Sequence, residues 1–456
     1  MKDRRRKPEE RRGTTSVQPV LPPELLQFLE RRSYSLLVKG EAATGKTILA
    51  LSILRKIAAA GNYLYLSTRV SPTQLFENHP WLSEFRRVAD RQPAGEASAE
   101  VAEDERFVDA RLDEPVPFFE KITNELMDSR TPTIIIDAWD PIWMMMGEDA
   151  SLSNAKVLQT WRERADAKIV TLIEDSGDTS LDSLFDGVVV LDRYYDDGRI
   201  VRMMQLSKLS GVKINRPSCI FSLDGGVFQS FCPASPIDFD PRTPTNWSWE
   251  TRSPTGYREL DGILDGTLPS GTMVNLELAP TVNASTALLM IRGILGNGKS
   301  RSRIILFRPF EGIGVDRASG ALGELVPIQQ ANSRSSRSVP VGWVESLKMQ
   351  VQKQKATNRG KKIVALAGSD FLSKAGGDEE RERLFEFMKS DIDLSVIVSR
   401  DETSVENAAR VADISLKLSD IDGTPVLQPQ LPWTEYFALS TSTSEKASKV
   451  TLVPIV

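Results

Sequence analysis

One eight-residue stretch, GEAATGKT at residues 40–47, constrains the fold of this chain more than any other. It follows a mostly apolar run, SLLV at residues 35–38, and precedes ILALSILRKIAAAG, which has the composition of a helix. The pattern G-x-x-x-x-G-K-[ST] between a strand and a helix is that of a P-loop, whose backbone N–H groups surround phosphate oxygens. The sequence therefore predicts a nucleotide-binding α/β domain.

The P-loop assigns a role to each part of the predicted site. Lys46 supplies a positive charge near the β- and γ-phosphates, and the Thr47 hydroxyl is placed to bind Mg²⁺. The run TIIID ends at Asp137, whose carboxylate can hold a water of the Mg²⁺ shell. We therefore expect ATP and Mg²⁺ as cofactors, with Lys46 and Asp137 as the catalytic candidates and Thr47 and Asp137 as the metal candidates. The predicted nucleotide-binding residues are Gly40, Glu41, Ala42, Ala43, Thr44, Gly45, Lys46 and Thr47.

Short β-branched runs alternate with helical stretches along residues 34–231, which is typical of a parallel sheet covered by helices. The expected strands are 34–38, 63–67, 133–137, 168–173 and 187–191, followed by hairpin-like runs at 199–209 and 218–231. The predicted first domain, residues 16–231, is a P-loop domain of the α/β class.

A segment rich in Pro, Ser, Thr and Asp, residues 232–254, is predicted to be a linker. After it the same order of elements recurs, with strands expected at 273–278, 303–307, 362–370, 394–401 and 412–418. Five elements in one order favour an internal duplication over two unrelated α/β domains. The second domain is therefore placed at residues 255–456.

The second half has lost the P-loop. The corresponding stretch is APTVNAST at residues 279–286, which has no glycine and places Ser285 where Lys46 would be. A β-branched Val282 resists the positive φ that such a turn needs. The acidic strand end survives only as Ser369 and Asp370. We expect this half not to bind ATP productively.

Composition narrows the function classes. Net charge is −5 over 456 residues, so nothing global indicates nucleic acid. With only Cys219, Cys232 and the single His79, a disulfide framework or a multi-ligand zinc site is not expected. No apolar run has the length of a membrane span and the start lacks the apolar core of a signal peptide, so we expect no membrane association and a cytoplasmic protein with reduced thiols.

Two stretches have uneven charge. Residues 1–12 carry seven Lys/Arg and three Asp/Glu, and residues 1–15 are predicted to be a basic flexible arm. Residues 93–114 carry eight acidic and two basic residues and are predicted to be a solvated insertion. Either stretch can contact a partner, but charge runs of this kind are usually solvated.

Several motifs resemble known families. TGYRELDGILDGTLPSGTMV at residues 255–274 resembles the entry signature of RecA, RadA and KaiC ATPases, and QLSKLSG followed by FSLDGGVFQS resembles the K-M-R-G hairpin and closing strand of KaiC-like domains. KGEAATGKT, LYLSTRVSP and the ending QLPWTEYFAL…LVPIV are similar to archaeal gas-vesicle regulatory proteins of the GvpD kind. The resemblance implies tandem RecA-like domains, the second degenerate, and a homo-oligomer.

The chain also departs from the active members of these families. KaiC-like domains carry paired glutamates after the second strand, but residues 67–70 read Ser-Thr-Arg-Val, so Arg69 takes that place. The K-M-R-G element reads Lys-Leu-Ser-Gly at residues 208–211 and keeps only Lys208. A missing general base costs roughly 10²–10⁴-fold and a missing arginine finger roughly 10³–10⁵-fold. We therefore expect slow or absent hydrolysis, with Lys208 and Arg69 as candidate contacts between subunits.

Three functions stay open at this point. The first is a nucleotide-dependent regulator in which ATP or ADP controls binding of a protein partner. The resemblance to gas-vesicle regulatory proteins implies a transcription regulator as that partner. The second is a working RecA/KaiC-like ATPase whose base is Asp140 or Glu174. The third is a RadA-like nucleic-acid-binding protein, for which the basic runs at residues 350–362 and 333–338 speak. Those runs lack interleaved aromatics, so nucleic acid is not favoured.

Overall fold

The computed structural model describes residues 18–57, 62–86, 106–129, 131–175, 177, 180–231, 259, 261, 268–295, 303–310, 312–328, 342–369, 378–400, 408–444 and 447–456. The predicted basic arm, the whole predicted linker and Asp370 lie outside them. These residues form two compact units. The first lies within residues 18–194 and 202–230, and the second within residues 195–201 and 231–456.

The first unit is built on a nine-stranded sheet in the order β3-β2-β4-β5-β1-β6-β7-β8-β9. Strands β1 to β5 pair in parallel with their neighbours, and β1 also pairs in parallel with β6. The antiparallel part follows, with β7 pairing against β8. The strands are β1 (Tyr34–Lys39), β2 (Tyr63–Ser67), β3 (Phe107–Asp109), β4 (Thr133–Asp137), β5 (Lys168–Ile173), β6 (Gly187–Asp196), β7 (Arg199–Leu209), β8 (Ser218–Ser222) and β9 (Gln229–Phe231).

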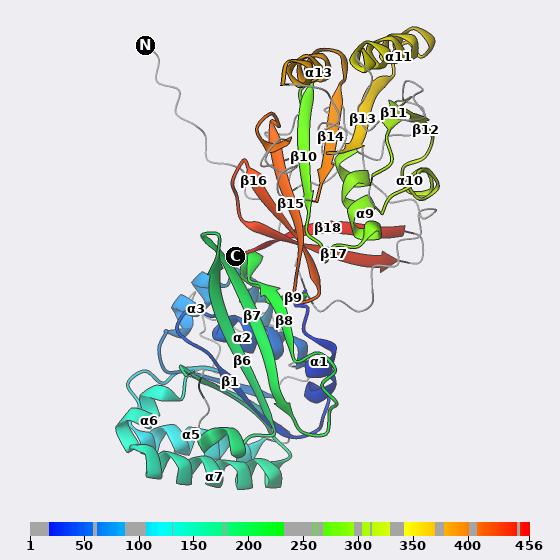
Figure 1. Ribbon diagram of the computed structural model, residues 1–456. Helices are drawn as coiled ribbons and strands as arrows, with labels where there is room; N and C mark the ends of the chain where they lie inside the picture. The colour runs from blue at the N-terminus through cyan, green and yellow to red at the C-terminus, as the bar shows by residue number, and fades with distance from the viewer. Residues whose placement is uncertain are drawn as a thin grey trace, which may run out of the picture. The chain divides into compact units, whose positions relative to one another are not determined.

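Helices cover both faces of this sheet, as Figure 1 shows for α5, α6 and α7 on one face and α2 on the other. Alternation along each strand explains this, because successive side chains point to opposite faces. Leu37, Ile134 and Ile136 pack with α5 to α7, whereas the buried Leu36 and Ile135 point to the other face. The helices are α1 (Pro23–Leu29), α2 (Lys46–Ile57), α3 (Pro72–Asn78), α4 (Ser83–Arg86), α5 (Pro115–Asp128), α6 (Asp140–Met146) and α7 (Glu148–Ala165).

The second unit repeats this strand order, in a nine-stranded sheet β12-β11-β13-β14-β10-β15-β16-β17-β18. Its strands are β10 (Thr272–Leu278), β11 (Arg303–Phe307), β12 (Leu325–Pro327), β13 (Lys362–Gly368), β14 (Leu394–Ser399), β15 (Ile414–Ile421), β16 (Thr424–Leu431), β17 (Tyr436–Ser444) and β18 (Ala447–Ile455). Helices α9 (Ala284–Leu295) and α10 (Val315–Leu322) pack on one face, and α11 (Trp343–Thr357) and α13 (Asp378–Asp391) on the other. The predicted fold class, tandem RecA-like α/β domains, is confirmed.

One sequence-based expectation needs correction. Within the acidic segment, predicted to be a solvated insertion, residues 107–109 instead form β3 beside β2, whereas Arg111, Leu112 and Glu114 are exposed. Phe107 is buried and stacks on Tyr65 with 5.2 Å between ring centroids. Its aromatic ring supplies the core contact that outweighs the acidic composition around it. Residues 93–105 lie outside the described part of the chain.

Among the described residues, no helix is both long enough and apolar enough to cross a membrane.

Candidate P-loop site

The loop between β1 and α2 has the backbone geometry of a phosphate cradle. Gly40 and Gly45 have φ of +150° and +105°, and Ala43 has φ of +60°. A Cβ on Gly45 would lie 2.8 Å from Cδ1 of Leu223, and one on Gly40 would overlap the carbonyl oxygen of Leu191. These two positions therefore need glycine both for their φ and for the close approach of neighbouring atoms.

Lys46 lies inside this loop. Its Nζ donates hydrogen bonds to the carbonyl oxygens of Gly40 at 2.6 Å and Glu41 at 2.7 Å. The residue is buried, and burial lowers the pKa of the Lys46 ammonium while the nearby Glu174 carboxylate opposes that shift. A cation in a loop of backbone N–H groups at a helix N-terminus is suited to bind a phosphate chain.

Thr47 and Asp137 meet at the metal position that the sequence predicts. The Thr47 hydroxyl donates to Oδ2 of Asp137 at 2.8 Å, and the Tyr65 hydroxyl donates to the same oxygen at 2.6 Å. Burial raises the pKa of Asp137, although both hydrogen bonds act in the opposite direction. A carboxylate held by two hydroxyl groups beside a P-loop fits the coordination of Mg²⁺ through water, since Mg²⁺ keeps several waters in such sites.

The position where KaiC-like domains carry glutamates is occupied by an ion-paired arginine. Arg69 Nη2 lies 2.5 Å from Oε2 of Glu174 and 3.4 Å from Oδ2 of Asp140. Asp140 Oδ1 in turn accepts from the backbone N–H of Glu174 at 2.8 Å. The hydrogen bond from Arg69 lowers the pKa of Glu174, so this carboxylate is a weaker base than an isolated one.

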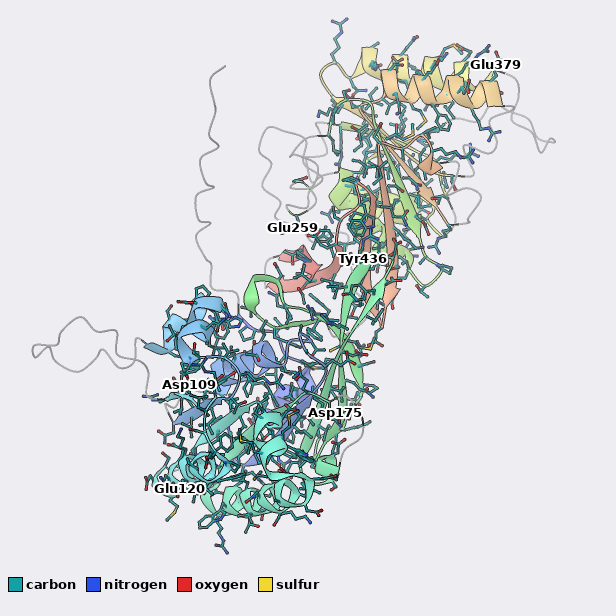
Figure 2. All side chains as sticks on the ribbon, turned by 90° about the vertical axis from the view of Figure 1, so that its left-hand side faces the viewer. Asp109, Glu120, Asp175, Glu259, Glu379 and Tyr436 are labelled. Carbon is teal, nitrogen blue, oxygen red and sulfur yellow. The ribbon has the colours of Figure 1, made fainter. Side chains whose placement is uncertain are left out.

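These side chains surround one cavity of about 340 Å³, here called the P-loop cavity. It lies at the carboxyl ends of the strands, where open α/β sheets bind ligands. Asp109, the last residue of β3, and Asp175, shortly after β5, mark this edge in Figure 2. Among the described residues, no group of three or more His, Cys, Asp or Glu side chains could hold a metal ion, so Mg²⁺ here would depend on phosphate oxygens. The cavity is lined by Ala42, Ala43, Gly45, Lys46, Thr47, Ile48, Arg69, His79, Asp137, Ala138, Glu174 and Leu223.

Lys208, the predicted contact to another subunit, lies elsewhere. Its Nζ donates to the carbonyl oxygen of Asp182 at 3.3 Å, and the Asp182 carboxylate pairs with the buried Lys39 at 2.8 Å. Lys208 is not among the described residues that line the P-loop cavity of its own chain. A contact to a neighbouring copy therefore stays a prediction.

Several residues of the site escaped the sequence-based prediction, among them Tyr65, His79, Leu223 and Arg202. His79 and Leu223 line the cavity, and Arg202 on β7 donates to the carbonyl oxygen of Ala43 at 2.9 Å. The loop that carries His79 reaches the site because Trp81 Nε1 donates to the Gly226 carbonyl oxygen at 3.0 Å. No local pattern marks these residues.

In the second unit, the stretch that corresponds to the P-loop is filled by its own side chains. Val282 is buried, and the Asn283 side-chain oxygen accepts from the backbone N–H of Thr286 at 2.9 Å. Ser285, in the place of Lys46, accepts from Arg317 at 3.0 Å. The second unit thus has a serine hydroxyl, contacted by a guanidinium group, at the position of the P-loop ammonium.

The strand order, the glycine-dependent loop and the acidic end of β4 define a P-loop protein built from tandem RecA-like domains. More particularly, residues 25–207 match the family described as GvpD gas vesicle protein, P-loop domain. Over these residues, which are less than half of the chain, the protein resembles the GvpD P-loop domain.

Two curated relatives come from Halobacterium salinarum. Protein GvpD1 is 29% identical over 286 residues, which cover 58% of this chain and 51% of the relative. Protein GvpD2 is 27% identical over 302 residues, which cover 60% of this chain and 59% of the relative. The chain thus spans little more than half the length of the relatives it matches.

Proposed function

We propose that residues 40–47 bind one Mg²⁺-ATP per chain and that the bound nucleotide controls the binding of a protein partner. The observation that carries this proposal is the meeting of Thr47 and Asp137 beside Lys46, in a loop whose glycines admit no side chain. The nucleotide supplies the charged phosphates. The chain supplies backbone N–H groups, an ammonium and a carboxylate that orient them.

Hydrolysis on this proposal is slow or absent. The place of the water-activating carboxylate holds Arg69, and Glu174, a carboxylate that does line the cavity, is bound to that arginine. An efficient general base needs a pKa near the operating pH, whereas the arginine lowers that of Glu174. The loop thus serves as a ligand sensor, because a ligand-dependent shape needs only different affinities for two conformations.

A working ATPase is the second candidate, and Glu174 is the observation in its favour. This carboxylate borders the same cavity as Lys46 and Thr47. If Arg69 moves to the phosphates during binding, Glu174 is released to act as a base. A nucleic-acid function gains no support at this edge of the sheet, because Asp140, Glu174 and Asp175 would repel a phosphate backbone.

The family suggests where this switch acts. The matching family is described as a gas vesicle protein, and the two relatives carry the GvpD name. We propose a regulatory role in gas vesicle formation. The proposed partner is a transcription regulator, and the proposed working form is a homo-oligomer. The test is a pull-down with the wild type and Lys46→Ala, each with and without ATP, combined with mass measurement. If both variants capture the same proteins equally under all conditions and the mass is unchanged, the switch is refuted.

A further inference from the structure

A second cavity, of about 460 Å³, lies next to the P-loop cavity and shares Glu174 with it. We call it the acidic cavity. It is formed where β4 and β5 end and α6 and α7 begin, so its walls come from segments that strand pairing brings together. It is lined by Trp139, Asp140, Trp143, Met144, Glu148, Ile173, Glu174, Asp175, Ser180 and Leu181.

The described residues that line this cavity include four carboxylates and no basic side chain. Two of them, Asp140 and Glu174, already bind a guanidinium group, that of Arg69 from the neighbouring cavity. The pair thus has the spacing that a guanidinium needs. The carboxylates come from three places, the start of α6, the start of α7 and the segment after β5, so their charges suit an extended organic cation.

The apolar lining indicates a protein as the source of that cation. Trp143, which is half-buried, offers aromatic surface to the stem and head of an arginine or lysine, whereas Trp139 forms the wall of the cavity from the core side. Beside them, Met144 and Met145 are 82% and 57% exposed. Exposed methionines adapt to the irregular apolar side chains of a partner segment. A nucleic acid would meet repulsion here, and a small free cation would leave this apolar surface unused.

We propose that the acidic cavity binds an arginine- or lysine-bearing segment of a partner protein, and that Arg69 makes this binding depend on the nucleotide. This rests on the proposed function, since it needs a triphosphate at Lys46 and Thr47. Arg69 lines the P-loop cavity, so a γ-phosphate there competes with Glu174 and Asp140 for its guanidinium. When Arg69 turns to the phosphate, both carboxylates lose their internal cation and are free to bind the partner.

The site is tested with hexa-arginine as the probe and hexa-citrulline, its neutral isostere, as the ligand control. Full-length chain carrying Glu148→Gln and Asp175→Asn is compared with a charge-matched variant, Glu120→Gln and Asp128→Asn, on the exposed surface of α5 (Glu120 and Asp175 are labelled in Figure 2). We expect hexa-arginine to bind the cavity variant at least about fivefold more weakly, since one exposed ion pair contributes up to about that factor. The matched variant and hexa-citrulline should show no such difference. Equal loss in both variants would refute the site.

The coupling is tested in the same titrations with ADP and with a non-hydrolysable ATP analogue. Wild type should bind hexa-arginine at least about fivefold more tightly with the triphosphate, a typical size for coupling between sites. Arg69→Gln should bind equally with either nucleotide, because its carboxylates are always free. Equal binding by the wild type with both nucleotides would refute the coupling.

Two further measurements separate the alternatives. Calorimetry of nucleotide binding on the same samples tests the proposed function, so a chain that binds ATP but fails the peptide titrations refutes only this inference. A full-length variant with the seven Lys/Arg of residues 1–12 changed to Gln tests the chain's own arm as occupant. Unchanged hexa-arginine affinity supports an external partner, and a clear increase would assign the cavity to the arm instead.

Discussion

The hydroxyl of Thr47 donates a 2.8 Å hydrogen bond to the carboxylate of Asp137, a residue 90 positions further along the chain. The bond joins the start of α2 to the end of β4, two elements that the sheet order places on either side of the P-loop cavity. Tyr65 on β2 binds the same carboxylate oxygen at 2.6 Å. Three separate segments therefore fix the position of one acidic group where a Mg²⁺ ion would need it.

Replacement of Lys46 should abolish ATP binding. Lys46→Ala removes the one ammonium group among the described residues that line the P-loop cavity. Losing one partner of a buried charge pair costs about 3–5 kcal/mol, or at least about a hundredfold in affinity. Calorimetry measures the affinity and the number of sites. Ser285→Ala, at the matching position of the second unit, is the control and should bind like the wild type. Two sites per wild-type chain would contradict a degenerate second unit.

Asp137→Asn should raise the thermal stability of the nucleotide-free chain and remove the effect of Mg²⁺ on it. Burial raises the pKa of Asp137 in the folded chain. The ionised carboxylate therefore destabilises the folded chain at pH values above this raised pKa. The destabilisation decreases as pH falls through the raised pKa. Asp137→Asn removes the charge, so without nucleotide its melting temperature at neutral pH should rise by a few degrees, about 2–4 °C per kcal/mol. The additional stabilisation by Mg²⁺ with ATP should disappear. Scanning calorimetry with and without Mg²⁺ measures both effects, and a retained Mg²⁺ effect would argue against Asp137 as the metal residue.

Turnover should lie well below the enzyme median of about 10 s⁻¹. The physical reason is the state of the two carboxylates among the described residues that line the P-loop cavity. Asp137 accepts a hydrogen bond from Thr47, and Glu174 is held in an ion pair by Arg69. Phosphate release by purified wild type is the measurement, with Lys46→Ala as the background control. A rate near the median would support the working ATPase.

Acid should destabilise the chain through its single histidine. Burial lowers the pKa of His79 below its ordinary value of 6.5, and its Nδ1 has no hydrogen-bond partner. The unfolded state therefore binds more protons than the folded state, so stability is lost as pH falls below 6.5 and levels off below the folded pKa. Urea unfolding from pH 8 to 5 should show a gap between wild type and His79→Gln that narrows with acid. A constant gap would show that His79 titrates normally.

Removal of Arg199 should weaken the second unit, to which the hairpin tip Tyr195–Val201 belongs. Its guanidinium lies 4.4 Å from the ring centre of Trp433 and 4.8 Å from that of Tyr436, and it donates to the carbonyl oxygens of Pro429 and Thr434. Arg199→Met leaves these carbonyl groups without that donor, at a cost of about 2–3 kcal/mol. Hydrogen exchange of peptides from β16 and β17 reports the loss. The exposed Arg216→Met is the control, and equal effects would contradict a specific role for Arg199.

The sequence predicted well what short-range rules govern. Short runs of β-branched residues located the strands of the parallel regions, and the motif at residues 40–47 located the turn between β1 and α2, because a P-loop is a local device of one turn between strand and helix. Asp137 was found because it ends a buried strand. The internal repeat was readable for the same reason, since both halves carry the same order of local patterns, and the two sheets share one strand order.

The tertiary structure alone decided which distant side chains meet. The acidic composition around Phe107 suggested a solvated segment, but packing against Tyr65 makes it an edge strand. The ion pair of Arg69 with Glu174 follows from the sheet order, which places the ends of β2 and β5 on either side of β4. Periodicity and propensity act over a few residues, whereas ion pairs and cavities depend on strand order. The sequence by itself therefore determined the phosphate cradle, and the folded sheet determined the charges that surround it.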